Sequence, residues 1–498
     1  MLFTVTRAYS LNLIFHRLLV VVVIVFISTA SLLRAEQPNI LVILADDMGY
    51  GDLNCLGSEH LKTPHCDALR ESGVLCTQAY VASPVCSPSR AGLMTGRDPR
   101  RFGYEGNLNQ SAEKYATRPE LLGLPSGEWT LGDHLKASGY STSLIGKWHL
   151  GTQDRFHPNQ RGFDYFCGML VGSHGYFPDR NSNRLERNGR PLRDFSSSYL
   201  TDFFTDEAIK WIDGTTSRDQ EKPWFLFLSY NAPHGPLQAK QEDLERFQHI
   251  QDPKRQKYAA MMYALDRGVG RIVNKLQAQG AGKNTLICFF SDNGGATNNG
   301  SWNGPLSGVK GCLKEGGIRV PMIWSWPGSL PPKSTFSGVV SSLDLLPTLL
   351  TAAGSQPLPL AAARSHEDGR NRKRIVAKYG AYDGIDLLPL LTGKTSPAAR
   401  RLFWRLQGQT AVLDFSGNQN DKLIVLSHRP AQLFRPQADP GECEDLAHQS
   451  ESRTGELFTM IGEWEAMLPT VPLWGSSPFW AGQSSKNYDT WPVRSEPH

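Results

Sequence analysis

Residues 39–47 read Asn39-Ile40-Leu41-Val42-Ile43-Leu44-Ala45-Asp46-Asp47, an apolar run that ends in two aspartates. An unbroken run of aliphatic side chains predicts a strand that is buried on both faces. Strands of this kind are typical of parallel sheets covered by helices. The stretch therefore predicts an α/β fold in which Asp46 and Asp47 follow the carboxyl end of a buried strand.

The rest of the chain repeats this alternation of apolar strands and capped helices. Further strands are predicted at 74–80, 140–145, 224–230 and 285–291. Helices are predicted at 63–73, 130–138 and 254–279; the first opens at Thr63-Pro64 and ends at Gly73. This β-α-β order predicts a large, mostly parallel sheet sandwiched by helices.

The length and the amino terminus bound the class of protein. A chain of 498 residues suggests one large and one smaller domain. Residues 1–35 contain three arginines, no acid and the apolar run 18–27, which predicts a signal peptide and an exported protein, periplasmic or extracellular. The run is short for a membrane span, and an uncleaved anchor is the alternative. Removing residues 1–35 lowers the net charge from +4 to +1, which gives no support for a nucleic-acid partner.

The carboxyl-terminal third predicts a smaller unit. Two strand-like runs at 409–415 and 422–427 flank a glycine-asparagine turn and predict a hairpin, followed by a helix from about 452 to 467. The expected parts are a signal peptide (1–35), a catalytic α/β domain (36–394) with an insertion at about 358–381, a small antiparallel α+β subdomain (395–470) and a tail (471–498).

Polar side chains follow several of the predicted strands. In open α/β sheets ligands bind beyond the carboxyl ends of the strands. The residues at these ends are Asp46-Asp47, Gly146-Lys147-Trp148-His149, Asn231-Ala232-Pro233-His234 and Asp292-Asn293. A single aspartate after a strand is more often a turn or capping residue, but here several strands deliver polar groups to one edge.

These strand-end residues predict a site for a cation and an anion. Asp46, Asp47, Asp292 and Asn293 offer only oxygen donors, which suit Ca²⁺ or Mg²⁺ better than Zn²⁺. Lys147 and His149 are two positions apart, so in an extended segment both would face the same side. Together with His234 and Arg90 they would surround a group with negative oxygens, such as sulfate or phosphate.

The segment Cys86-Ser87-Pro88-Ser89-Arg90 predicts a reactive side chain at a helix start. Ser87 suits the N-cap and Pro88 the first helical position, which would place Cys86 at the mouth of the helix with Arg90 pointing back toward it. The alternative is a disulfide cysteine beside a capped helix. The eight cysteines show no metal-binding spacing, and they would either pair in an exported chain or pack in the core.

At these residues the chain resembles a type I, formylglycine-dependent sulfatase of the alkaline phosphatase superfamily, arylsulfatase-like. The resemblance runs from about residue 37 to 395. The matching segments are Asp46-Asp47-Met48-Gly49, Cys86-Ser87-Pro88-Ser89-Arg90, Gly146-Lys147-Trp148-His149-Leu150-Gly151, Asn231-Ala232-Pro233-His234, Ser291-Asp292-Asn293-Gly294-Gly295, and Lys310 ahead of Glu315-Gly316-Gly317-Ile318-Arg319. The cysteine box and the lysine-histidine segment make this pattern specific.

The resemblance implies an alkaline phosphatase-like fold and a modified active-site residue. A formylglycine-generating maturation enzyme would convert Cys86 to an aldehyde, which hydrates to a gem-diol. One Ca²⁺ per chain would be bound by Asp46, Asp47, Asp292, Asn293 and the diol at residue 86.

The resemblance also implies the roles of the remaining site residues. One diol oxygen would attack the sulfur of a sulfated carbohydrate or aryl sulfate and form a covalent sulfo-enzyme. Arg90, Lys147, Lys310 and His234 would bind the sulfate oxygens, and His234 would protonate the leaving alcohol. His149 would help the second hydroxyl to expel sulfate. Ser173 is a further candidate for a sulfate contact.

Three other functions are compatible with parts of this pattern. Phosphonate monoester or phosphodiester hydrolases of the same superfamily share the cysteine box. A non-catalytic exported binding protein on the same scaffold would have lost metal-binding or box residues, and none is lost here. Cys86 as a thiolate nucleophile would resemble cysteine-dependent phosphatases, but those need a longer glycine-rich loop between cysteine and arginine.

Overall fold

We describe the protein from a computed structural model. The described residues are 37–108, 119–178, 184–192, 199–218, 222–296, 298–358, 382–415, 420–469, 472–474, 488 and 496. The expected signal peptide, the insertion from residue 359 onward and most of the expected tail lie outside them. None of the helices within the described residues is both long enough and apolar enough to span a bilayer.

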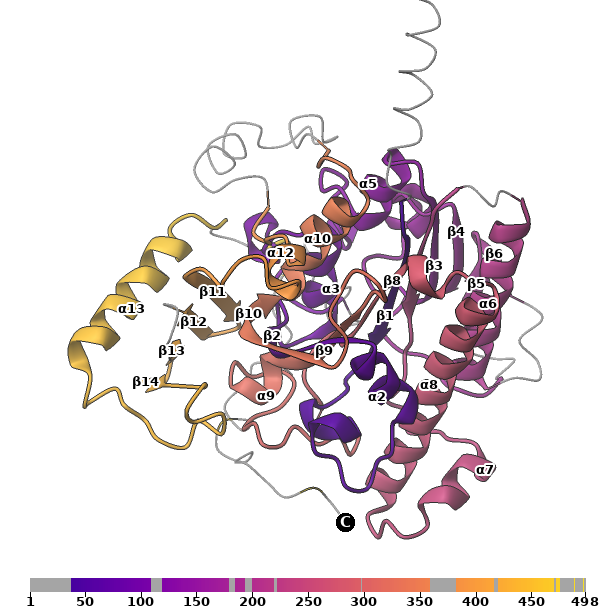
Figure 1. Cartoon of the computed structure of the whole chain (residues 1–498). Coiled ribbons are helices and arrows are strands. Elements are labelled where there is room, and N and C mark those ends of the chain that lie inside the picture. Colours follow the sequence, from indigo (N-terminus) through magenta and orange to yellow (C-terminus); the bar gives the residue numbers. More distant parts are fainter. Residues whose placement is uncertain are drawn as a thin grey trace, which may run out of the picture. The chain divides into compact units, whose positions relative to one another are not determined.

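A ten-stranded sheet forms the centre of the fold, in the order β10-β2-β9-β8-β1-β7-β3-β4-β5-β6 (Figure 1). The strands are β1 (Asn39–Ala45), β2 (Gly73–Tyr80), β3 (Ser141–Lys147), β4 (Tyr165–Met169), β5 (Leu185–Arg187), β6 (Arg190–Pro191), β7 (Trp224–Ser229), β8 (Thr285–Ser291), β9 (Arg319–Ser325) and β10 (Ser334–Ser341). The predicted strand at 39–45 is confirmed as β1, and its residues 40–45 are buried.

The sheet is parallel at its centre and mixed elsewhere. β1 pairs in parallel with β7 and β8, and β3 continues the parallel order to β4. β9 runs antiparallel to both β2 and β8, which the expectation of a mostly parallel sheet did not include. The cause is the connection from β8, which stays at the carboxyl edge instead of crossing the sheet, so that β9 starts at that same edge.

Helices cover both faces of the sheet (Figure 1). They are α2 (Pro64–Glu71), α3 (Cys86–Thr95), α5 (Leu131–Ala137), α6 (Leu200–Arg218), α7 (Gln241–Leu244), α8 (Pro253–Ala278), α9 (Glu315–Ile318), α10 (Leu345–Ala352), α12 (Leu388–Leu391) and α13 (Glu451–Glu465). Alternate residues of β1 belong to the hydrophobic cores on the two faces of the sheet. Leu41 and Ile43 pack with α2, α6 and α8 on one face. Ile40 and Val42 pack with α3, α5 and α10 on the other face.

A second, antiparallel sheet of four strands follows the main domain. It consists of β11 (Arg400–Leu406), β12 (Gln409–Phe415), β13 (Asn420–Leu426) and β14 (Arg429–Phe434), with α13 packed on β12 and β13. The predicted hairpin is confirmed as the pair β12 and β13, although its turn at 416–419 lies outside the described residues. Trp404 joins the two sheets: its indole packs on Tyr80 and its Nε1 donates to the Val81 carbonyl oxygen over 2.8 Å.

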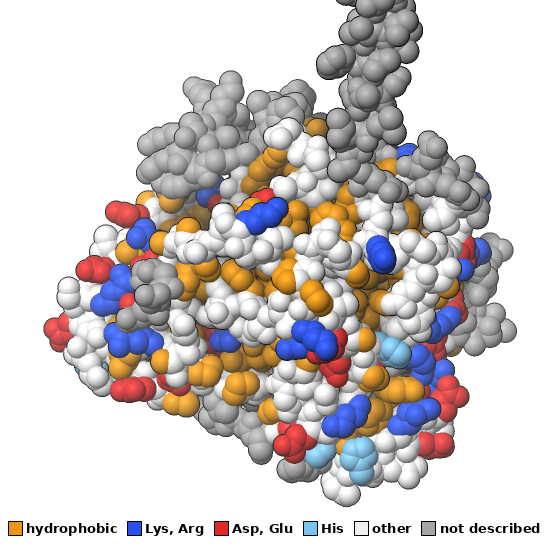
Figure 2. All heavy atoms as spheres, in the orientation of Figure 1, with side chains coloured by type: hydrophobic (Ala, Val, Ile, Leu, Met, Phe, Trp, Pro, Cys, Tyr) orange, Lys and Arg blue, Asp and Glu red, His pale blue; other side chains and the backbone are white. Residues whose placement is uncertain are grey.

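The surface charges of one face and the states of the cysteines can be described directly. On the face drawn in Figure 2, basic and acidic side chains are interspersed among apolar and polar ones. All eight cysteines lie within the described residues, and none of them forms a disulfide there. Of the two alternatives left open, pairing or core packing, five cysteines take the second and pack in the hydrophobic clusters, whereas Cys86 lies in the cluster described below. Cys443 is exposed and Cys55 is half-buried.

Candidate active site

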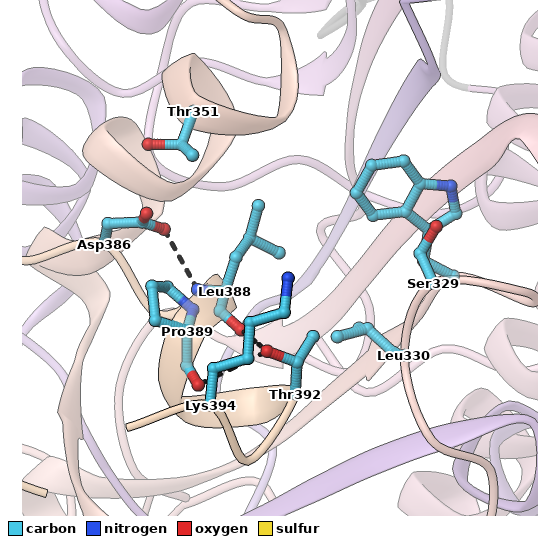
Figure 3. A pocket seen from close by; sticks show the side chains of 9 residues that line it. Ser329, Leu330, Thr351, Asp386, Leu388, Pro389, Thr392 and Lys394 are labelled. Carbon is cyan, nitrogen blue, oxygen red and sulfur yellow. Dashed lines mark hydrogen bonds between the residues drawn. The ribbon is translucent and has the colours of Figure 1, made fainter. Parts of the chain in front are cut away.

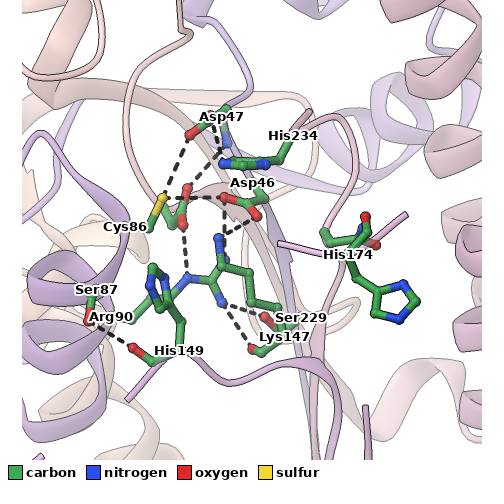
Figure 4. A network of polar contacts seen from close by, with 12 residues as sticks. Asp46, Asp47, Cys86, Ser87, Arg90, Lys147, His149, His174, Ser229 and His234 are labelled. Atoms are coloured by element: carbon green, nitrogen blue, oxygen red, sulfur yellow. Dashed lines mark hydrogen bonds and ion pairs between the residues drawn. The ribbon is translucent and has the colours of Figure 1, made fainter. Parts of the chain in front are cut away.

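The carboxyl ends of β1, β3, β7 and β8 meet at one edge and bring the predicted polar residues together (Figure 4). The backbone ties these ends to one another. The Asp46 amide donates to the Ala232 carbonyl oxygen and the Asp292 amide donates to that of Ala45, each over 3.0 Å. The two aspartates that end β1 are thus fixed between the segments that carry His234 and Asn293.

Cys86 lies at the start of α3, but the capping differs from the prediction. The helix begins at Cys86 itself and Val85 is its N-cap, with no side chain capping it. The Ser87 hydroxyl instead donates to the His149 carbonyl oxygen over 2.8 Å, and the Ser89 hydroxyl donates to that of Asp292. The two serines therefore connect α3 to the segments that carry His149 and Asp292. Because the Ser87 hydroxyl donates to His149, it does not cap the helix.

The Cys86 sulfur points into the cluster of carboxylates. Its Sγ lies 3.6 Å from Asp46 Oδ1, 3.8 Å from Asp47 Oδ1 and 2.9 Å from Lys310 Nζ. The residue is 1% exposed. Burial raises the pKa of the thiol to about 12, even though Lys147 and Lys310 act in the opposite direction. An unmodified Cys86 is therefore a neutral thiol at pH 7 and a weak nucleophile.

Three buried cations surround the carboxylates. Arg90 Nε donates to Asp292 Oδ2 over 2.8 Å, and its Nη1 donates to Ser229 Oγ over 2.7 Å. Lys147 Nζ lies 2.6 Å from Asp46 Oδ2, and Lys310 Nζ lies 2.5 Å from Asp47 Oδ1. Arg90 Nη2 is buried and has no hydrogen-bond partner among the described residues.

The cations decide the protonation of two aspartates. Burial opposes ionisation of Asp46, but Lys147, His234 and Arg90 lower its pKa well below the ordinary value. Burial also raises the pKa of Asp47, but Lys310 and His234 lower this pKa below its ordinary value. Asp292 behaves differently, because burial and the nearby charge of Asp46 raise its pKa to about 6. At neutral pH all three carboxylates are available as charged oxygen donors.

The two histidines flank the cluster in different ways. His234 lies with Nε2 3.6 Å from Asp47 Oδ2, and its Nδ1 pairs with the Gly235 carbonyl oxygen over 2.6 Å. His149 pairs through Nε2 with the Leu108 carbonyl oxygen over 2.7 Å, and its Nδ1 is buried without a partner among the described residues. Burial lowers the pKa of both imidazoles, and Lys147 adds to the shift of His149.

The backbone at His149 corrects the prediction of an extended segment. Its φ of 60° is left-handed, so the chain turns after β3 instead of continuing with alternating faces. The carbonyl oxygen of His149 accepts from Ser87, whereas the Lys147 side chain reaches Asp46. Lys147 and His149 both border the cluster around Cys86. The left-handed turn at His149 brings His149 there, and not the alternation of side chains along an extended strand.

The donor set fits a hard cation. One ligand atom from each of Asp46, Asp47, Cys86 and His234 lies within 4.8 Å of the others. Asp292 Oδ1 accepts from the Asp47 amide over 3.3 Å, and Asn293 Nδ2 donates to Asp47 Oδ1 over 2.7 Å. The Asn293 Oδ1 is buried without a partner in the described part of the chain, which leaves an amide oxygen for a cation.

Apart from Ser173, the site residues predicted from the sequence lie in or beside this cluster. Ser173 is exposed, and the imidazole of the neighbouring His174 points away from Cys86 in Figure 4. Three contributors were missed: Ser229, which accepts from Arg90, Asn299, whose Nδ2 donates to the Asp47 carbonyl oxygen over 3.2 Å, and the Leu108 carbonyl. Only Ser229 carried a signal, because it lies next to the last residue of the strand predicted at 224–230.

A separate surface pocket lies outside this cluster (Figure 3). Its volume is about 380 Å³, and it is lined by Trp326, Ser329, Leu330, Thr351, Asp386, Leu388, Pro389, Thr392 and Lys394. None of these residues belongs to the predicted site. The pocket therefore has no residue in common with the predicted site.

A comparison of the sequence with known families decides the class of protein. The sequence model described as Sulfatase matches residues 38–355, which include every residue of the cluster. The chain belongs to the sulfatase family. It is a sulfuric ester hydrolase, and the resemblance inferred from the motifs is confirmed.

Curated relatives of this sulfatase are themselves sulfatases. N-acetylgalactosamine-6-sulfatase of Mus musculus is 33% identical over 384 residues, which cover 73% of this chain and 69% of the relative. Arylsulfatase A of Homo sapiens is 33% identical over 491 residues, which cover 88% of this chain and 89% of the relative.

Solved structures confirm the alkaline phosphatase-like fold of this sulfatase. Ps i-CgsB, solved in complex with k-i-k-neocarrahexaose, superposes with a TM-score of 0.77 at 33% identity, covering 91% of this chain and 98% of that one. The phosphonate monoester hydrolase of Agrobacterium radiobacter has a TM-score of 0.60 at 18% identity, covering 86% and 96%. The second likeness extends to the fold alone.

Proposed function

We propose that this sulfatase removes sulfate from a sulfated carbohydrate, and from aryl sulfates, through a formylglycine made from Cys86 and with one bound Ca²⁺. The observation that carries the proposal is the position of Cys86. Its side chain starts α3, is buried, and points at Asp46, Asp47 and Lys310. We infer that Asp46, Asp47, Asp292, Asn293 and residue 86 hold the cation.

The chemistry of residue 86 argues for the modification. A neutral thiol with a pKa of about 12 is a weak nucleophile, and sulfur is a poor partner for a hard cation. Formylglycine, once hydrated, supplies an oxygen nucleophile with a second hydroxyl that allows the product to leave. Ca²⁺ supplies positive charge that lowers the cost of a developing negative charge.

The cations of the cluster are suited to bind the sulfate oxygens. Arg90 Nη2 has no hydrogen-bond partner among the described residues, and the ammonium groups of Lys147 and Lys310 converge on Asp46 and Asp47. A transferring sulfuryl group carries its negative charge on oxygens, which these donors can meet without reorganisation. We expect this to be the largest contribution of the chain's own side chains to the rate.

The histidines are suited to move protons. His234 is the more accessible, with a side chain that is 23% exposed, and it is the candidate donor to the leaving alcohol oxygen. Burial lowers its pKa, but the negative oxygens of a bound sulfate ester would favour its protonated form. His149, with a buried Nδ1 that lacks a partner among the described residues, is the candidate base for release of sulfate.

The relatives support a carbohydrate substrate. One curated relative is named for N-acetylgalactosamine 6-sulfate, and one solved relative holds k-i-k-neocarrahexaose. A formylglycine-generating maturation enzyme is then a required partner, because Cys86 is encoded as cysteine. The sequence of residues 1–35 favours an exported location.

Mass spectrometry of the peptide that contains residue 86 tests the nucleophile. We expect the mass of the aldehyde or its hydrate in active protein, whereas the exposed Cys443 should retain a thiol that alkylates. Parallel assays with an aryl sulfate and an aryl phosphodiester on one preparation test the reaction. An intact thiol or a cystine at residue 86 in fully active protein would overturn the proposal, and a preference for the phosphodiester would favour the alternative hydrolase.

A further inference from the structure

The loop that carries Lys310 receives much of its support from the carboxyl-terminal sheet. The loop spans residues 307–315, from the end of the Asp292 connection to α9. On the site side, the Lys310 amide donates to the Gly295 carbonyl oxygen over 3.0 Å and the Gly311 amide to that of Pro84 over 2.9 Å. These two bonds place the loop against the segments that precede α3 and follow β8.

On its other side the loop contacts a buried charge cluster. Lys422 Nζ of β13 lies 2.8 Å from Glu315 Oε1 and 2.8 Å from Glu442 Oε1. Glu442 Oε2 accepts from the Glu315 amide over 2.8 Å and from Ser307 Oγ over 3.1 Å, so that it holds both ends of the loop. The side chains of Lys422, Glu315 and Glu442 are 0% exposed.

The middle of the loop is also bound from the same direction. Gln409 Nε2 of β12 donates to the Gly311 carbonyl oxygen over 3.1 Å. Its Oε1 accepts from the Tyr488 hydroxyl over 2.7 Å, and that hydroxyl accepts from the Leu313 amide over 2.9 Å. Gly311 follows Lys310 directly in the chain. The Gly311 amide is bound by the main domain, through Pro84, and the Gly311 carbonyl oxygen is bound by the small sheet, through Gln409.

We propose that Gln409, Lys422 and Glu442 are positioning residues for Lys310, so that the carboxyl-terminal sheet sets the place of a sulfate-binding ammonium at residue 86. The proposal rests on the role of Lys310 given under the proposed function. These residues touch neither Cys86 nor the carboxylates at the edge of the main sheet in any contact described above. They act through the loop alone.

A double-mutant cycle with an aryl sulfate as substrate tests the coupling. Gln409→Leu removes the bond to Gly311 and keeps a side chain of similar volume, and Ser307→Ala removes one bond to Glu442. We expect each change to lower kcat/KM about tenfold, the order of effect that small misplacements of a catalytic group produce. In the Lys310→Ala background the same changes should have no further effect, because the group that they position is absent.

The controls separate positioning from loss of structure. Arg453→Met removes a bridge between Asp414 and Asp421 on the same small sheet without a contact to the loop, and it should leave kcat/KM unchanged. Thermal unfolding and the mass of residue 86 are measured for every variant. Losses that multiply with that of Lys310→Ala, or the absence of any loss, would overturn the inference. Full activity of Lys310→Ala would instead refute the role of Lys310 itself.

Discussion

The protein contains two buried clusters of charge that differ in how completely their polar atoms are paired. The first surrounds Cys86, with three carboxylates facing Arg90, Lys147 and Lys310. The second joins Glu315 and Glu442 to Lys422 and Arg319. Three buried atoms of the first lack hydrogen-bond partners among the described residues, namely Arg90 Nη2, His149 Nδ1 and Asn293 Oδ1, whereas the second has no such atom there.

This difference supports the proposal that the first cluster binds ligands and the second is a structural contact between the two sheets. A buried polar atom without a partner is costly, and a fold retains several at one place when something else binds there. The cluster at Cys86 can accept a cation and an anion together, since it offers atoms of both kinds. Each buried polar side-chain atom of the Lys422 cluster has a hydrogen-bond partner within the described residues, which suits a permanent contact between two sheets.

Removing the nucleophile should give the largest contrast between the two clusters. We expect Cys86→Ala to lower kcat by a factor on the order of 10⁶, as loss of a nucleophile does in other hydrolases. Its free energy of unfolding should change by no more than about 1–2 kcal/mol, because only one small side chain is lost from the core. Aryl sulfate turnover and urea unfolding measure the two effects. Activity within tenfold of the wild type would contradict the assignment of residue 86.

Removing Lys422 from the second cluster should lower the free energy of unfolding strongly and leave the conversion of residue 86 unaffected. Lys422→Met leaves Glu315 and Glu442 buried with Arg319 as the remaining cation, and removal of one partner from a buried ionic group costs about 3–5 kcal/mol. We expect that loss in the free energy of unfolding, with residue 86 still converted. A change below 1 kcal/mol, measured by urea unfolding, would show that the Lys422 cluster is not a structural joint.

Calcium should stabilise the first cluster and leave the second unaffected. A ligand present at a hundred times its dissociation constant adds about 2.7 kcal/mol to the stability of the state that binds it. We therefore expect EDTA to lower the unfolding midpoint and Ca²⁺ to restore it in the wild type and in Lys422→Met. Asp47→Asn should abolish this response, because it removes a charged ligand. Equal midpoints in EDTA and Ca²⁺ for the wild type would argue against a cation site.

A half-exposed ion pair on the small sheet should give the smallest effect. Arg453 has a side chain that is 24% exposed, and it bridges Asp414 and Asp421, which keep Arg401 and Arg435 as partners. Exposed pairs of this kind contribute at most about 1 kcal/mol. Arg453→Met should stay within that limit in urea unfolding. A loss as large as that of Lys422→Met would remove the distinction between a buried joint and a surface pair.

The buried strands and the residues at their ends were predictable because their signals are local. β1 is an apolar run that ends in two aspartates, and the polar residues after β3, β7 and β8 follow equally clear strands. Once the strands are parallel, their ends must meet. The Sulfatase match and the solved relatives then confirm the family and the fold that the motifs indicated.

The remaining features depend on contacts between distant parts of the chain. Ser87 has the character of a cap, yet its hydroxyl is taken by the His149 carbonyl, 62 positions away. The left-handed turn at His149 carries no local signal, since histidine is not a residue that demands it. Lys422 lies 107 positions from Glu315, and a lysine in a strand-like run gives no indication of a buried partner. The geometry of the loop that carries Lys310 was therefore beyond sequence reasoning.

The joint between the two sheets has a consequence for the order of events during translation. Gln409 bonds to Gly311 across 98 positions, and Glu442 bonds to Ser307 across 135. A nascent chain can pair the strands of the main sheet well before these partners leave the ribosome. We expect a premature stop between α12 and β12 to yield a product with an intact main sheet but without the contacts that hold the loop of Lys310. Such a product would be inactive because of a residue that lies more than eighty positions before the stop.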